Sequence, residues 1–119
     1  MLRTINIKEN SATVDYALAV VEIEIESAKR EGLTAIKVLH GYGSHGRGGA
    51  IKKALNEKLR QWKNGKFIID YFGGDKWNMF DKDTLKILQL DKTIFNDEDM
   101  NKSNPGITII WVNNWKSIS

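Results

Sequence analysis

The apolar positions at the start of the chain follow first a strand-like and then a helical pattern. Residues 2–8 alternate, with Ile5 and Ile7 on one face, and this predicts a short strand. Residues 21–26 also alternate, but a longer stripe with a spacing of three or four runs through them, which favours a helix that stops at Gly32. The stripe consists of Val14, Ala17, Leu18, Val21, Ile25 and Ala28.

Three more strands and a second long helix are expected further along the chain. Residues 35–39 and 66–72 are short apolar runs typical of buried strands, and residues 107–112 form a fourth strand. A helix is expected from near Ala50 to Asn64. Its apolar stripe consists of Ile51, Ala54, Leu55, Leu59 and Trp62. The order βαβαββ predicts the α/β class, as a small two-layer sandwich of a four-stranded mixed sheet and two main helices.

Residues 73–105 form an inserted segment before the last strand, within a single domain that covers residues 1–119. We expect a short helix in residues 81–90, with Leu85 and Leu88 directed inward, followed by a polar loop. The acidic run 97–99 is expected to be a solvated turn. Trp77 and Phe80 are expected to cover the sheet edge or to form a surface for a partner protein.

Composition and charge narrow the class of protein. No apolar run reaches the length of a membrane span, and no signal peptide is recognisable at the N-terminus. The chain has no cysteine, which rules out disulfides and thiolate zinc sites, and we expect a cytoplasmic protein. Ten basic and two acidic residues lie between Lys29 and Lys66, whereas both flanking parts are net acidic. This distribution predicts a one-sided positive surface suited to a polyanion.

The segment His40–Gly49 has the composition of a phosphate-binding loop, because five of its ten residues are glycine and it joins a strand to a helix. Glycines let an anion approach the backbone closely, and the free amides at the start of a helix favour negative charge. The spacing matches neither a P-loop nor a dinucleotide-binding fingerprint. The predicted nucleic-acid-binding residues are His40, Gly41, Tyr42, Gly43, Ser44, His45, Arg47, Gly48, Gly49, Lys52 and Lys53.

The run from Gly32 to Gly43, followed by Gly49-Ala50-Ile51-Lys52-Lys53-Ala54-Leu55, resembles the second signature of Smr (small MutS-related) domains. In that signature a strand ends in His-Gly-x-Gly and is followed by a glycine-bearing loop and a basic helix. Residues 13–18 resemble the start of the family's first helix. The resemblance implies an Smr-type fold and nucleic-acid binding, and it implies endonuclease activity for several members.

The first signature of the family, Leu-Asp-x-His-Gly, is absent from the end of the first predicted strand. Asn6 stands where the resemblance implies the aspartate, and Lys8 where it implies the histidine. An asparagine can neither act as a base nor carry the charge that a metal prefers, whereas a lysine can contact phosphate. This departure leaves it uncertain from sequence whether the protein is an enzyme.

Three functions therefore fit the sequence. The first is binding of DNA or RNA through the phosphate backbone. The second is Smr-type endonuclease cleavage, with His40 as the catalytic residue and Mg²⁺ or Mn²⁺ as the cofactor, although no metal ligand is assigned. Asp70 and Asp75 fit a ligand better than the acidic run 97–99. The third is a protein-interaction module that contacts its partner through residues 73–105.

Overall fold

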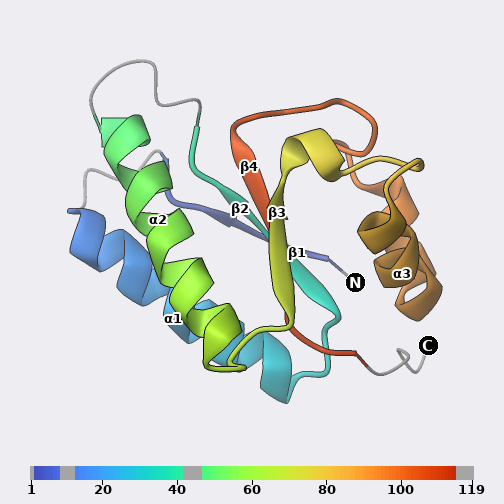
Figure 1. Cartoon of the computed structure of the whole chain (residues 1–119), viewed down its shortest axis with the longest axis horizontal. Coiled ribbons are helices and arrows are strands. Elements are labelled where there is room, and N and C mark those ends of the chain that lie inside the picture. The colour runs from blue at the N-terminus through green and yellow to red at the C-terminus, as the bar shows by residue number, and fades with distance from the viewer. Residues whose placement is uncertain (1, 9–12, 42–46, 115–119) are drawn as a thin grey trace.

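The computed structural model of the chain describes residues 2–8, 13–41 and 47–114. Its elements follow the predicted order, and the insertion contains two 3-10 helices in addition to the expected short helix (Figure 1). They are β1 (Arg3–Asn6), α1 (Val14–Arg30), β2 (Ala35–Leu39), α2 (Arg47–Asn64), β3 (Asp70–Gly73), the 3-10 helix η1 (Gly74–Lys76), α3 (Lys82–Leu90), the 3-10 helix η2 (Lys92–Asn96) and β4 (Ile107–Trp111). The predicted α/β class is confirmed.

The sheet is mixed and has the strand order β1-β2-β4-β3. β1 and β2 are parallel, and β4 runs antiparallel to both β2 and β3. Leu39 pairs with Asn6 on one side and with Ile107 on the other, while Gly73 pairs with Thr108. The carboxyl ends of β1, β2 and β3 and the amino end of β4 therefore share one edge of the sheet.

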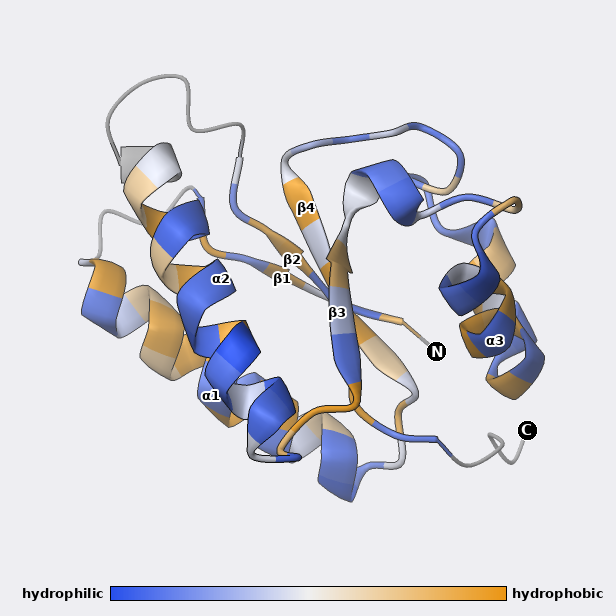
Figure 2. Ribbon diagram, viewed as in Figure 1, coloured by the Kyte–Doolittle hydropathy of each residue, from blue (hydrophilic) through white to orange (hydrophobic). Residues whose placement is uncertain are grey.

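Helices α1 and α2 pack side by side on one face of this sheet (Figure 1). Thr13 caps α1, since its hydroxyl oxygen accepts a hydrogen bond from the backbone nitrogen of Tyr16 at 3.2 Å. The predicted apolar stripes form the core between helices and sheet, including Val21, Ile25 and Leu55, which have no exposed surface. Figure 2 shows the blue, hydrophilic side of α2 turned away from the sheet.

The insertion covers the opposite face of the sheet and builds a second core there (Figure 1). Trp77, Ile94 and Met100 are buried against β4 and its neighbours. The prediction for α3 was half wrong: Leu88 is buried, but Ile87 takes the second inward position and Leu85 is exposed. The expected polar loop after α3 instead contains η2, because Ile94 and Met100 need a folded backbone to reach the core.

A buried ion triad attaches the insertion to the sheet. The ammonium of Lys37, on β2, donates hydrogen bonds to the carboxylates of Asp97 at 2.8 Å and Asp99 at 2.7 Å. Burial alone would lower the pKa of Lys37, but the two carboxylates outweigh it and raise that pKa. The indole nitrogen of Trp77 also donates to Asp97, at 3.0 Å. The expectation of a solvated acidic turn was therefore wrong, and Lys37 adds nothing to a positive surface.

Two predicted boundaries moved. Helix α2 begins at Arg47 and not near Ala50, so Gly48 and Gly49 belong to its first turn. Strand β3 begins at Asp70 and not at residue 66, because Lys66 has a left-handed backbone with φ of 63° and the next amide, that of Phe67, bonds back to the carbonyl of Trp62. Among the described residues, no helix combines the length and the apolar character that crossing a membrane requires.

Candidate nucleic-acid interface

The edge of the sheet where β1 and β2 end brings together residues from four separate parts of the chain. Ile7 donates its backbone N–H to the carbonyl of Leu39 at 3.0 Å, so the two strands stay paired up to the edge. Beyond it, the backbone nitrogen of Lys8 donates to the side-chain oxygen of Asn6 at 3.0 Å. A Cβ placed on Gly41 would lie 3.7 Å from the Cβ of Lys8. Lys8 and Gly41, 33 positions apart in the sequence, are thus neighbours.

The backbone of Gly41 is fixed by the turn that precedes β4. The amides of His40 and Gly41 both donate to the carbonyl of Gly106, at 2.9 and 3.1 Å. Gly41 has φ of 82°, a left-handed conformation that glycine adopts without the penalty of a side chain. A Cβ on Gly106 would lie 3.3 Å from the Cα of Gly41, so both glycines allow the close approach of these two segments.

The side chain of His40 is buried below this edge, and both ring nitrogens have partners. Nδ1 lies 2.9 Å from the carbonyl of Gly41, and Nε2 lies 2.9 Å from the hydroxyl of Thr108. A carbonyl can only accept, so Nδ1 carries the proton and Nε2 accepts from the threonine. Burial lowers the pKa of His40, and the nearby charge of Lys52 lowers it further. The neutral ring therefore holds Gly41 and β4 in place.

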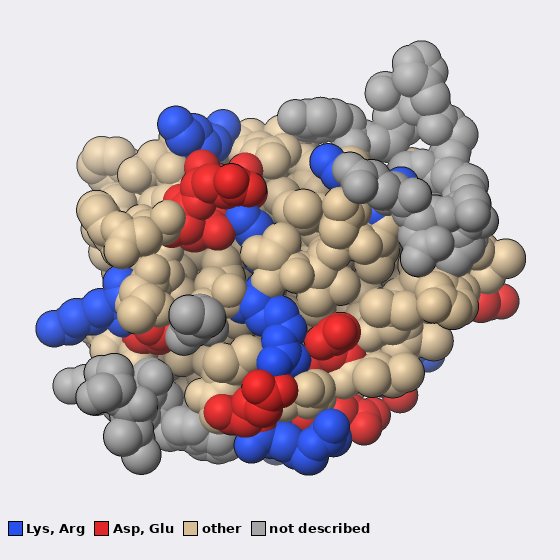
Figure 3. All heavy atoms as spheres, turned by 180° about the vertical axis from the view of Figure 1, so that it is seen from behind, with Lys and Arg blue, Asp and Glu red and all other residues tan. Residues whose placement is uncertain are grey.

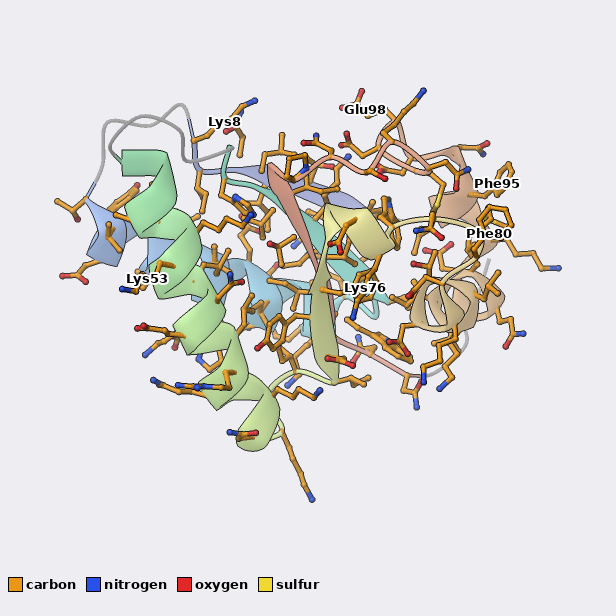
Figure 4. The ribbon with its side chains drawn as sticks, turned by 45° about the horizontal axis from the view of Figure 1, so that its top comes forward. Lys8, Lys53, Lys76, Phe80, Phe95 and Glu98 are labelled. Carbon is orange, nitrogen blue, oxygen red and sulfur yellow. The ribbon has the colours of Figure 1, made fainter. Side chains whose placement is uncertain are left out.

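Lys8 lies beside Gly41, and Lys52 lies at the Pro105–Gly106 turn that holds Gly41. Lys8 is exposed at the end of β1 (Figure 4). Lys52, in the second turn of α2, donates to the carbonyl of Pro105 at 3.3 Å and acts on the pKa of His40. Lys53 is exposed on α2 and projects away from Lys8 (Figure 4). Of the two lysines predicted on α2, only Lys52 therefore lies on the same side as Lys8. In the sequence, Lys8 was noted mainly because it replaces the histidine of the family's first signature.

A chain of hydrogen bonds links the buried ion triad to the same edge. Asp99, which pairs with Lys37, accepts from the side-chain nitrogen of Asn104 at 3.0 Å. The side-chain oxygen of Asn104 accepts from the backbone nitrogen of Gly106 at 2.8 Å, and the carbonyl of Gly106 holds Gly41. No role was predicted from the sequence for Asn104 or Gly106.

Part of the predicted loop lies outside the described residues. Outside them lie Tyr42, Gly43, Ser44, His45 and Gly46. Of Arg47 and Gly48, only the backbone is described. The predicted involvement of these residues stays a prediction. What the structure does place are the two ends of the loop, at Gly41 and at the amino end of α2, whose first turn holds Gly49.

Three of the five carboxylates considered for a nuclease site are paired with lysines. Asp70 forms an ion pair with Lys63 at 3.0 Å, and Asp97 and Asp99 are held by Lys37. Over the described parts of the chain, no three histidine or acidic side chains gather as a metal site would require. On the face turned away from the view of Figure 1, acidic side chains lie beside basic ones and do not form a separate patch (Figure 3).

Comparison with known proteins identifies the family. The family model of the Smr domain matches residues 10–71, which is more than half of the chain. The chain belongs to the Smr domain family. Members of this family are, in general, nucleic-acid-binding or nuclease modules. A search of the curated proteins gave no match.

A solved Smr domain has the same fold. The crystal structure of the Smr domain of Thermus thermophilus MutS2 matches with a TM-score of 0.58 over 93% of this chain and 98% of that chain, at 20% sequence identity. An identity of this size establishes a shared architecture only. The Smr match itself ends inside β3, so the insertion and β4 lie beyond the matched residues.

Proposed function

We propose that this Smr domain binds DNA or RNA through the phosphate backbone, at the edge formed by Lys8, Gly41 and Lys52. The observation that supports this most is the convergence of two lysines from different elements on a glycine backbone. Lysines placed on both sides of an open backbone can neutralise adjacent phosphates and release counterions. The first turn of α2, which follows the glycine-rich loop, adds free amide groups and a favourable dipole.

We further propose that the edge binds nucleic acid without cleaving it. A general acid or base needs a ring nitrogen within reach of the substrate, and both nitrogens of His40 are occupied and buried. Asn6 lacks the carboxylate that the family's first motif supplies, and its side-chain oxygen accepts from the backbone of Lys8. Endonuclease activity is the alternative, and cleavage that disappears in His40→Ala with the fold intact would favour it.

Neutralising the two converging lysines tests the proposal. The double variant Lys8→Gln, Lys52→Gln should reduce affinity for single-stranded RNA or duplex DNA. It should also lower the slope of log affinity against log salt concentration by about two, since each phosphate contact contributes about one. Lys82→Gln with Lys86→Gln is the matched control, because both lysines are exposed on α3, across the sheet from α2. Equal slopes for both double variants would contradict the proposed site.

A second candidate function is protein binding through residues 73–105. Phe80 is 95% exposed, on a turn whose backbone is held by the side chains of Asn78 and Asn101. A large apolar side chain fixed in solvent is typical of a contact with another protein. Phe80→Ser should leave nucleic-acid affinity unchanged and should abolish retention of any partner that the wild-type protein keeps after nuclease treatment. Retention unchanged by Phe80→Ser would argue against this surface.

A further inference from the structure

Helix α1 has apolar side chains that lie outside its contact with the core. The residues that attach it to the core are Ala17, Val21, Ile25 and Ala28, all at most 4% exposed. Yet in its first eight residues, 14–21, only Asp15 is polar apart from the tyrosine hydroxyl. A helix that is apolar around its circumference usually has neighbours on more than one side. Figure 2 shows this orange half of α1 at the margin of the molecule.

Apolar side chains also lie on the outer side of α1, where they form a second stripe. Tyr16 is 55% exposed and Ile23 is 64% exposed, and their separation of seven residues places them on the same side of the helix. Ala19, which is exposed, lies between them at helical spacing, and Val20, which is partly buried and packs against the core, lies at the margin of the stripe. We call these four residues the outer stripe of α1. It is about 10 Å long, from the rise of 1.5 Å per residue.

A column of carboxylates runs beside the outer stripe. Asp15, Glu22 and Glu26 follow one another at intervals of seven and four residues, which aligns them along one side of the helix. Among the described residues, none of the three has an ion-pair partner, whereas Glu24 on the other side is paired with Arg3 at 3.2 Å. The outer stripe thus combines exposed apolar surface with uncompensated negative charge.

We propose that the outer stripe of α1 binds a basic amphipathic helix of another protein, one with an apolar stripe and lysines or arginines along its side. Recognition of a helix by apolar anchors spaced at three, four and seven residues is a recurrent mode of binding. The carboxylate column then pairs with the basic residues, which sets the orientation and favours fast association. This interface is separate from the edge at Gly41 and does not rest on the proposed nucleic-acid binding.

The same charges argue against other occupants. In a second copy of the chain, antiparallel packing of α1 against α1 would bring the two carboxylate columns to the same side of the contact, and like charges in contact disfavour binding. The outer face of α2, with Lys53, Asn56 and Arg60, is basic but carries no apolar stripe. Nucleic acid and anionic lipid surfaces are repelled by the column as well.

A designed peptide probes this surface directly. The probe is an 18-residue helix with leucines at intervals of three and four and lysines along one side, and the matched peptide replaces each lysine by glutamate. Binding is followed by ¹⁵N amide shifts of the full chain and by fluorescence anisotropy. We expect the lysine peptide to bind more tightly, with shifts centred on residues 16–26. Ile23→Ser should weaken the binding of the lysine peptide about tenfold. Glu22→Lys with Glu26→Lys should make the chain prefer the glutamate peptide over the lysine peptide.

Phe95→Ser is the control for Ile23→Ser, because Phe95 is 53% exposed on η2, away from α1. These side chains are exposed, apart from Glu22, which is partly buried, so circular dichroism should show an unchanged fold. Equal affinity for both peptides, no binding of either, or the same loss in Ile23→Ser and Phe95→Ser would overturn the proposal. A dimer in sedimentation that Ile23→Ser dissolves would also overturn it, in favour of a second copy of the chain.

Discussion

Replacing Lys37 by methionine tests whether the ion triad holds the insertion on the sheet. The substitution keeps the length of the side chain and removes its charge. Asp97 and Asp99 would then remain in a site where their side chains are only 10% and 14% exposed, without a cation. Removing one member of a buried ion pair typically costs about 3–5 kcal/mol, because the remaining charge stays buried and unpaired. We expect a loss of that size in the free energy of unfolding.

The pH dependence of the loss gives a second readout. In the wild-type protein the pKa of Asp99 is lowered, since the hydrogen bond from Lys37 and further contacts outweigh burial, which alone would raise it. The stability from this group is therefore present above the ordinary pKa of 3.8 and lost as the pH falls below it. Without Lys37 the carboxylate of Asp99 gains a proton more easily, so the difference in stability between variant and wild type should shrink toward pH 4 and below.

Urea unfolding, followed by fluorescence and by hydrogen exchange of the Gly106 amide, is the assay. Asp97→Asn with Asp99→Asn, added to Lys37→Met, removes the unpaired charges and should recover much of the stability. The amide of Gly106 should lose protection in Lys37→Met, because Asn104 connects it to Asp99. A loss in the free energy of unfolding below about 1 kcal/mol in Lys37→Met, as for a surface ion pair, would show that the triad does not hold the insertion on the sheet.

Further predictions concern the edge of the sheet. Burial lowers the pKa of His40, so its contribution to stability is complete above pH 6.5 and declines as the pH falls below it; thermal unfolding of His40→Gln should lack this decline. Gly41→Ala should cost about 1–2 kcal/mol in urea unfolding, from its φ of 82°, and a neutral result would exclude the left-handed backbone. Gly74→Ala should cost about 3 kcal/mol, since its Cβ would lie 1.9 Å from the carbonyl of Asn104. Lys53→Glu should weaken nucleic-acid binding less than Lys52→Glu in the same titration.

The order of the elements could be predicted from the sequence because the two long helices repeat their apolar period several times and two of the strands are short apolar runs. The stripe of α1 and the run 35–39 leave little choice of structure. Short or bent segments were harder to predict. β3 was placed too early because the apolar run begins at Phe67, whereas the backbone first turns at Lys66 to close the end of α2.

The candidate site was predictable only where its residues lie in one segment. His40, Gly41 and Lys52 were proposed from the glycine-rich loop and the basic helix after it. The partners Thr108, Asn104 and Gly106 come from the far end of the chain, and nothing in their local sequence shows that they meet Gly41. Asp97 and Asp99 were taken as solvated for the same reason, since their cation, Lys37, is hidden within an apolar strand 60 residues away.

A salt titration of binding can establish whether this Smr domain binds nucleic acid through phosphates, as proposed above. Labelled single-stranded RNA and duplex DNA are titrated with the purified chain at several salt concentrations, with native gels for binding and denaturing gels for cleavage. Complexes that weaken steeply with salt, with the nucleic acid left intact, are the predicted result. No complex at low salt, or an affinity that does not change with salt, would contradict binding through the phosphates.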